Sequence, residues 1–399
     1  MYLNGSKWKM SKHPRRRSRP WRILMLLALI AVVVYINLQV VPVVEPFFIP
    51  TVTPTTNPES YINQAEAYYQ EGKLLNAIDA YKQAILAEPN NSSHYVNLTR
   101  VQILAGQYED ALENSELALL RSNDNPLAHV VHAWALDFTG DYVQAEASIK
   151  TALELAPDNA FAHAVYAEIL IDNGDFEKAS EESIRALELD PTSLETHRAR
   201  GYVLYWTGNY ERAITEYSAA ININNKIPNL HLMQGYSYYA IGEYDQAVSA
   251  FNQANALNPS NPTPDYEISR IYLLEGLYSR AIQYASQAVE DDPTNAKMHG
   301  NLGVMYAKNG QYPEALEHLS LAVQGGMTSN NEVVNGISLS YDLKVIEIFS
   351  SYSLTLARTD RCEEAIPIFQ TMLSQVGENE IAVANANEGL SICQQSLDD

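Results

Sequence analysis

Apolar and small residues recur at helical spacing along most of the chain, in pairs of short segments. Between residues 197 and 204, for example, the positions expected to face the core follow the spacing i, i+3, i+4 and i+7. From residue 58 onward this pattern predicts amphipathic helices of about a dozen residues, two to a unit. One such pair cannot bury its apolar face alone, so we expect successive pairs to stack on one another.

The units are marked by a glycine that recurs at a constant interval, at positions 72, 106, 140, 174, 208, 242, 276 and 310. An alanine follows each glycine at the fifth position, and a second alanine follows at the seventh position after the first. We expect the glycine to supply a turn conformation that other residues reach only with strain. The small residues predict close approach of helix backbones. Eight units in one register fill residues 58–329.

This period and pattern resemble the tetratricopeptide repeat family, whose unit is a helix–turn–helix of about 34 residues. The resemblance includes a closing proline in five units, at Pro89, Pro157, Pro191, Pro259 and Pro293. It implies an all-α superhelical solenoid of about nine repeats plus a capping helix, whose first helices line a concave surface. The place of the family's tryptophan holds Tyr61, Tyr95 and five histidines, His129, His163, His197, His231 and His299. We interpret these histidines as packing residues, because equivalent places in neighbouring repeats are too far apart to share a metal ion.

The register breaks after the eighth unit, because the next matching alanine is Ala365, which lies nearly half a period later than the register requires. We therefore predict an insertion at 330–345 and a degenerate ninth repeat at 346–379, with Asp360 in the glycine place. Residues 380–399 are predicted to form a capping helix and an acidic tail. Cys362 and Cys393 both lie near the expected turns, and the sequence leaves open whether they form a disulfide.

The N-terminal segment predicts a membrane anchor. Residues 23–44 form an apolar run long enough to cross a bilayer as a helix, after a basic tail at 1–22 and before a Pro/Thr-rich linker at 45–57. A cleaved signal peptide is the alternative, but no small-x-small cleavage site follows the run. Eight basic residues precede the run, and the next basic residue is Lys73. This asymmetry predicts a single-pass protein of the cell membrane, with a cytoplasmic N-terminus and an extracytoplasmic repeat domain.

Charge and motifs narrow the function. The chain carries a net charge of −22, and its basic N-terminal segment leaves an acidic body of −30. Nucleic acid is therefore disfavoured as a partner, since phosphate binding needs clustered Lys and Arg. We find no phosphate-binding glycine loop, no HExxH and no nucleophile elbow. The sequence predicts a non-catalytic scaffold with no cofactor and no metal site.

The resemblance places one stripe of each first helix on the concave surface, and here that stripe is rich in aromatic residues and arginine. Such residues dominate binding hot spots, so we predict that the groove binds an extended segment of a protein partner. The alternative for the stripe is packing between repeats. For the function, the alternatives are a cytoplasm-facing anchored receptor or an accessory subunit of an enzyme or secretion complex. The predicted contact residues are Trp134, Phe138, Arg198, Tyr202, Tyr205, Trp206, Tyr236, Tyr239, Tyr266 and Arg270.

Overall fold

The computed structural model describes residues 20–35 and 57–398, and the chain divides into two compact units, 1–55 and 56–399. In the first unit, α1 (Pro20–Tyr35) covers the beginning of the predicted membrane span. The rest of that span, most of the basic tail and nearly all of the linker lie outside the described residues. No helix within the described ranges is both long and apolar enough to cross a membrane.

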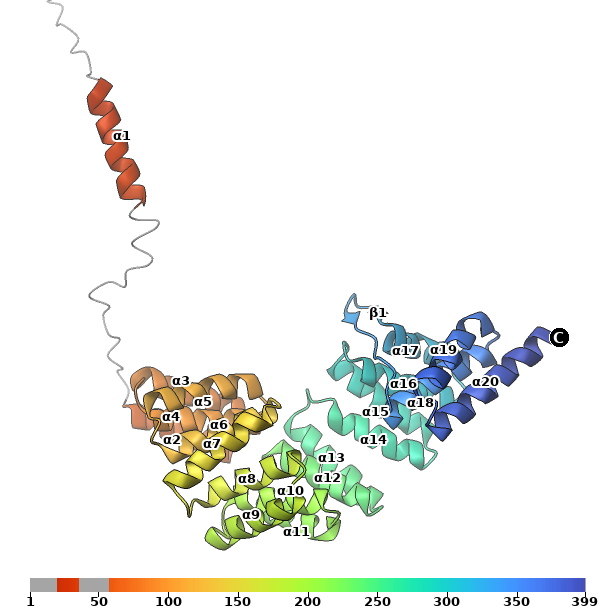
Figure 1. Cartoon of the computed structure of the whole chain (residues 1–399), viewed down its shortest axis with the longest axis horizontal. Coiled ribbons are helices and arrows are strands. Elements are labelled where there is room, and N and C mark those ends of the chain that lie inside the picture. Colours follow the sequence, from red (N-terminus) through yellow and green to blue (C-terminus); the bar gives the residue numbers. More distant parts are fainter. Residues whose placement is uncertain (1–19, 36–56, 399) are drawn as a thin grey trace, which may run out of the picture. The chain divides into compact units, whose positions relative to one another are not determined.

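The second unit is a succession of antiparallel helix pairs (Figure 1). The first helices of the pairs are α2 (Pro58–Gln70), α4 (Ser92–Leu104), α6 (Pro126–Phe138), α8 (Ala160–Asp172), α10 (Leu194–Trp206), α12 (Pro228–Ala240), α14 (Thr263–Leu274), α16 (Ala296–Lys308) and α18 (Leu343–Arg358). The second helices are α3 (Leu74–Ala87), α5 (Tyr108–Arg121), α7 (Tyr142–Leu155), α9 (Phe176–Leu189), α11 (Tyr210–Ile223), α13 (Tyr244–Leu257), α15 (Tyr278–Asp291), α17 (Tyr312–Gln324) and α19 (Cys362–Gln375).

The small residues of the repeat allow the two helices of a pair to pack closely. A Cβ atom placed on Gly201 of α10 would lie 3.0 Å from the ring of Tyr217 of α11. At Gly235 of α12 the same atom would lie 2.6 Å from the ring of Phe251. In both pairs the large ring on the second helix fills the space that the glycine leaves, which confirms the predicted close approach.

The turn between the two helices of each pair has the predicted left-handed conformation. Gly208 has φ of +78°, and its N–H donates to the carbonyl of Tyr205 at 3.0 Å, while Asn209 N–H donates to Leu204 at 2.8 Å. These bonds satisfy the last carbonyls of the helix, and a positive φ is needed to form them. Asp360 has φ of +60° at the same place in the ninth repeat, so the conformation persists where the glycine is absent.

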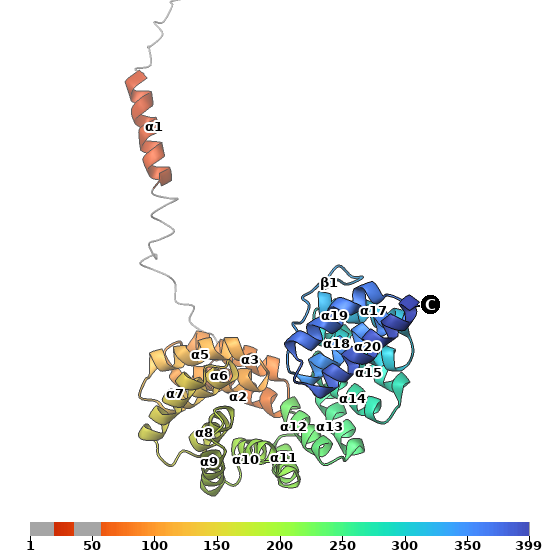
Figure 2. The same ribbon diagram turned by 45° about the vertical axis from the view of Figure 1, so that its right-hand side comes forward.

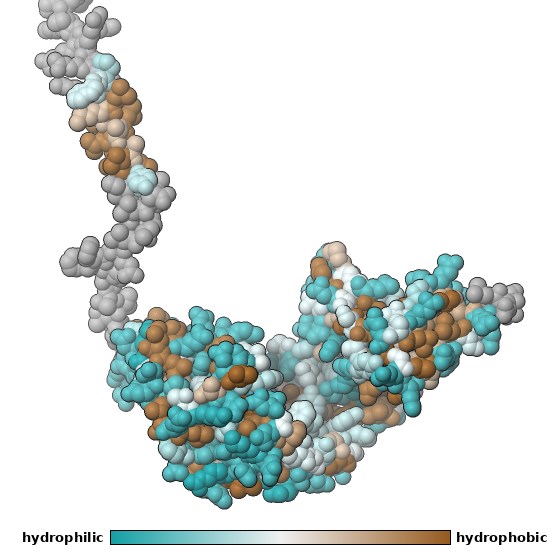
Figure 3. Space-filling view, viewed as in Figure 1, coloured by the Kyte–Doolittle hydropathy of each residue, from teal (hydrophilic) through white to brown (hydrophobic). Residues whose placement is uncertain are grey.

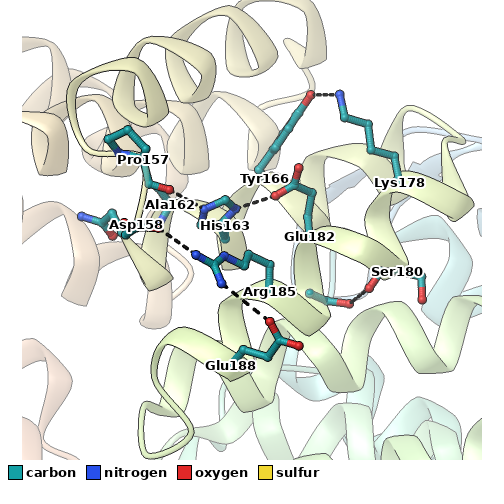
Figure 4. Close-up of polar contacts among 12 residues, drawn as sticks. Pro157, Asp158, Ala162, His163, Tyr166, Lys178, Ser180, Glu182, Arg185 and Glu188 are labelled. Carbon is teal, nitrogen blue, oxygen red and sulfur yellow. Dashed lines mark hydrogen bonds and ion pairs between the residues drawn. The ribbon is translucent and has the colours of Figure 1, made fainter.

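The repeated histidines join consecutive repeats through hydrogen bonds. In each of the five, Nε2 lies within hydrogen-bond distance of the backbone carbonyl six residues earlier; His163 reaches Pro157 at 2.8 Å. His163 also pairs through Nδ1 with Glu182 of α9, at 2.5 Å, and Arg185 pairs with Asp158 of the same turn (Figure 4). Each histidine thus fixes the turn that enters its own repeat, and no cluster of three metal-ligating side chains occurs among the described residues.

The C-terminal part differs from the regular repeats. After α17 comes a short antiparallel hairpin, β1 (Gly326–Met327) and β2 (Val333–Val334), which the all-α prediction did not include. Helix α18 begins at Leu343, a few residues before the predicted start of the ninth repeat. Helix α20 (Glu380–Asp398) closes the stack, and a disulfide joins Cys362 of α19 to Cys393 of α20, with 5.4 Å between their Cα atoms.

The curvature of the stack brings the first repeat against the end of the fifth. The side chain of Asn224, after α11, donates to the carbonyl of Tyr69 in α2 at 3.4 Å. A Cβ on Gly72 would lie only 2.3 Å from Cβ of Lys226, so the two turns are in contact. Figure 2 shows α2 beside α12 at this contact. Segments far apart in the sequence therefore close the first turn of the superhelix.

Candidate partner-binding surface

The predicted contact residues all belong to first helices, which form the inner face of the superhelix, but they fall into two groups. Trp134 and Arg198 are buried, with 0% and 7% of their surface exposed. This corrects the expectation that they are exposed in an open groove. The physical reason is the tight curvature of repeats 3 to 5, where neighbouring first helices close over these side chains. The other eight residues keep exposed or partly exposed side chains.

Arg198 is the centre of a buried charge network. Its Nη2 donates to Oε2 of Glu168 at 2.6 Å, and its guanidinium lies 4.5 Å from the centre of the Trp134 ring. A second arginine, Arg100 of α4, donates through Nε to Glu195 of α10 at 2.8 Å across the first superhelical turn. Burial alone would raise the pKa of Glu195, but the charge of Arg100 and the hydrogen bonds that the carboxylate accepts from Arg100, Ser193 and its own backbone N–H together outweigh burial and lower the pKa. These arginines therefore stabilise the curvature of the inner face.

Two further carboxyl groups lie beside this network. Asp137 of α6 is 6% exposed and shares a hydrogen bond with Asp172 of α8, which is exposed. Burial, with the neighbouring charge of Asp172, raises the pKa of Asp137 to about 9. Burial also raises the pKa of Glu168, to about 7, against the opposing charge of Arg198. Burial raises the pKa of Asp172 as well, although the hydrogen bonds from Tyr202 and Asp137 oppose this rise. Asp137 is thus expected to keep its proton at neutral pH and to donate it to Asp172.

This arrangement predicts that the repeat domain loses stability at alkaline pH. A carboxyl whose pKa is higher in the folded chain binds its proton more tightly there than in the unfolded chain. Its stabilising contribution is complete below its ordinary pKa near 4 and is lost as pH rises through about 9. The melting temperature should therefore fall between pH 6 and pH 9, and Asp137→Asn should reduce this fall. An equal fall in the variant would show that Asp137 is not the responsible group.

An aromatic patch occupies the inner face from α10 to α14. It consists of Tyr202, Tyr205, Trp206, Tyr236, Tyr239 and Tyr266. The Trp206 ring is 53% exposed and meets the rings of Tyr202 and Tyr205 edge to face, at centroid distances of 6.2 and 5.6 Å. Tyr205 in turn lies 6.5 Å from Tyr236. Edge-to-face pairs hold the rings in fixed orientations, so the patch is already organised before any partner arrives.

Charged residues border the patch, and all of those described below except Arg270 come from outside the predicted set. Glu267 of α14 accepts from the Tyr236 hydroxyl at 3.3 Å and pairs with Lys344 of α18 at 3.6 Å. Arg270, a predicted contact residue, pairs with Glu347 at 2.7 Å. Asp172 accepts from the Tyr202 hydroxyl at 2.7 Å. Asp172 lies four residues after Glu168, one helical turn along the same face, so the sequence could have indicated it as an inner-face residue. Lys344 and Glu347 lie beyond the break in the repeat register, so no repeat position predicts that they face the patch.

A cavity of about 410 Å³ lies where the first superhelical turn closes. Its walls come from the turns after α2 and α4, from Trp134, Phe138 and Arg198, and from the turns at either end of the α12–α13 pair. Phe138 stacks on Tyr108 with 4.5 Å between ring centres and is 38% exposed. The inner face thus offers a cavity with both polar and apolar walls and an aromatic patch. Such features suit binding, and none of the described residues forms a recognisable catalytic arrangement.

Comparison with known proteins identifies the family and the fold. Family models described as tetratricopeptide repeat match residues 58–91, 126–149, 139–183, 167–226, 232–296 and 272–325, which together cover more than half of the chain. None of the curated proteins searched matches the sequence.

Solved structures that resemble the chain are distant in sequence. A chain of the APC/C hetero-tetramer Cut9–Hcn1 matches at 16% identity and a TM-score of 0.50, over 63% of this chain and 49% of that one. A tetratricopeptide repeat protein from Parabacteroides merdae matches at 18% identity and a TM-score of 0.41, over 62% of this chain and 98% of that one. PilF of Pseudomonas aeruginosa matches at 22% identity and a TM-score of 0.43, over 49% and 88%.

The similarity to the Cut9–Hcn1 chain bears on the fold alone, and the present chain spans only about half the length of that chain. The family assignment rests on the matching repeat models and on the regular spacing of the glycines. The structure agrees with it, because it contains the helix pairs, the left-handed turns and the closely packed small residues. The chain belongs to the tetratricopeptide repeat family.

Proposed function

We propose that this protein is a non-catalytic scaffold whose aromatic patch binds an extended segment of a protein partner. Proteins built from such repeats generally act in protein–protein interaction, and the inner face is where this chain presents preorganised aromatic rings. The observation that carries the proposal is Trp206. Its place in the repeat is occupied elsewhere by residues as different as Gln70, Asp172 and Lys308, so the scaffold itself does not require an aromatic residue there.

The exposure of Trp206 supports a role outside the fold. An indole with 53% of its surface in solvent contributes less to the core than a buried one, yet it lies against two tyrosines that hold it in place. Exposed, rigid aromatic residues are enriched among the hot spots of interfaces, because they lose little entropy on binding and bury a large area. We therefore expect the loss of the Trp206 side chain to reduce the affinity for the partner more than the loss of any other residue of the patch.

We expect Trp206→Ala to weaken partner binding by about 2 kcal/mol or more, roughly a thirtyfold loss of affinity. The melting temperature should change little, because the indole is largely exposed. The matched control is Phe176→Ala, which removes a ring that is 47% exposed at the start of the outer helix α9. Affinity capture from detergent-solubilised membranes, with each variant as bait, would measure the difference. Equal retention of the partner by both variants would refute the proposal.

For the N-terminal segment we propose that the apolar run at 23–44 anchors the protein in the cell membrane and that the repeat domain is extracytoplasmic. The proposal is supported by the eight basic residues that precede the run, since the next basic residue is Lys73. It is also supported by the exposed apolar side chains of α1, such as those of Leu24 and Leu26. Figure 3 shows apolar surface along this helix. A reporter that is active only outside the cytoplasm, fused after Asp399, should be active. Activity of a cytoplasmic reporter at the same place would reverse the orientation.

A further inference from the structure

The cations around the aromatic patch are already neutralised within the fold. Arg198 pairs with Glu168, Arg270 pairs with Glu347, and Lys344 pairs with Glu267. An anionic partner segment would have to compete with these carboxylates for each cation, and it would approach a body with an excess of about thirty negative charges. The inner face is therefore poorly suited to an acidic segment.

Among the charged residues that border the patch, Asp172 differs in having no ion-pair partner within the described part of the chain. It is exposed, and it accepts a hydrogen bond from the Tyr202 hydroxyl at 2.7 Å. Its other close partner is Asp137, whose carboxyl shares a hydrogen bond with it. Asp172 therefore presents a carboxyl group at the surface that is in no ion pair with a described side chain, while Arg198 acts on the buried Asp137.

The same carboxylate is adjacent to the exposed indole. Asp172 and Trp206 occupy equivalent places in consecutive repeats, and Tyr202 connects them, with its hydroxyl on Asp172 and its ring against Trp206 at 6.2 Å. A cationic side chain can lie over a tryptophan or tyrosine ring, where the electron-rich face attracts it, while it pairs with a carboxylate beside the ring. Long lysine and arginine side chains have the reach to make both contacts.

We propose that the partner segment is cationic, and that one of its lysine or arginine side chains lies between the Trp206 and Tyr202 rings and the Asp172 carboxylate. This inference rests on the proposed function, because it concerns the same surface. It adds the chemical class of the partner: an extended segment rich in lysine or arginine, whose charge complements that of the acidic body.

The test uses the full-length chain and three fluorescein-labelled peptides of twelve residues, in which Ala-Arg-Leu, Ala-Gln-Leu or Ala-Glu-Leu is repeated four times. Fluorescence anisotropy at 0.15 M salt should show that the arginine peptide binds at least about tenfold more tightly than the glutamine peptide. The glutamate peptide should bind most weakly. Asp172→Asn should lower the affinity for the arginine peptide about tenfold and leave the affinity for the glutamine peptide unchanged.

The control for non-specific attraction is Asp245→Asn, which removes the same charge from an exposed residue of the outer helix α13. It should not change binding. Equal effects of Asp172→Asn and Asp245→Asn, or no binding of the arginine peptide at 100 µM, would overturn the inference. If the arginine and glutamine peptides bind equally well and Trp206→Ala weakens both, the inference fails while the proposed function stands. If the arginine and glutamine peptides both bind and Trp206→Ala changes the affinity of neither, the proposed function fails as well.

Discussion

Replacing Arg198 with methionine is expected to lower the free energy of unfolding by about 3–5 kcal/mol, the usual cost of removing one partner from a buried ion pair. The side chains of Arg198 and Glu168 are 8% and 4% exposed, and their 2.6 Å contact is the main compensation for burying the Glu168 carboxylate. Methionine would also remove the cation that lies over the Trp134 ring. Chemical denaturation followed by circular dichroism would measure the change.

Two variants separate the effect of burial from that of charge alone. Arg185→Met breaks an ion pair with Asp158 whose side chains are 46% and 77% exposed, so it should cost less than about 1 kcal/mol. The double variant Arg198→Met with Glu168→Gln should regain part of the loss, because no unpaired charge remains buried. If Arg198→Met and Arg185→Met had similar effects, the charge network of the inner face would not stabilise the fold.

Replacing Cys393 with serine is expected to destabilise the C-terminal end of the superhelix by about 3–4 kcal/mol, as for a disulfide that closes a loop of some thirty residues. The bond joins residues 31 apart, and both cysteines are buried, at 8% and 1% exposed. Helix α20 packs mainly against α18 and α19, so it is expected to depend strongly on this link. Amide exchange of α20 would locate the loss.

The matching control for the disulfide is the unchanged protein under reducing conditions, which should lose the same stability as Cys393→Ser. The variant itself should then respond little to the reductant. Two free thiols in the denatured, unreduced protein would exclude the bond. So would identical stability of the unchanged protein with and without reductant.

The sequence alone is sufficient to predict the repeat and much of the local structure within each unit. The regular glycine register predicts the helix pairs, and Asp360, which takes the glycine place between α18 and α19, has the same positive φ. These features are local, since a turn or a close helix contact depends on residues within one unit. The disulfide had been left open by the sequence, because the distance between the two Cα atoms depends on how α20 folds back.

Contacts between distant repeats could not be predicted in this way. The bonds from Asn224 to Tyr69 and from Arg100 to Glu195 join segments 155 and 95 residues apart, and no periodic pattern specifies them. They depend on the small rotation between repeats, which accumulates along the stack. For this reason Trp134 and Arg198 were expected in an open groove and lie buried instead. The hairpin of β1 and β2 was missed because its strands have only two residues each.

Site-specific photo-cross-linking tests the central claim, that the inner aromatic patch holds the partner, most directly. A photoreactive phenylalanine analogue would be placed at position 206 in one full-length protein and at position 176, on the outer helix α9, in another. After irradiation in cells, mass spectrometry would identify the cross-linked peptides. We expect position 206 to cross-link to one recurring segment of another protein and position 176 to give no such cross-link. Partner cross-links at position 176, with none at position 206, would show that the partner does not bind the aromatic patch.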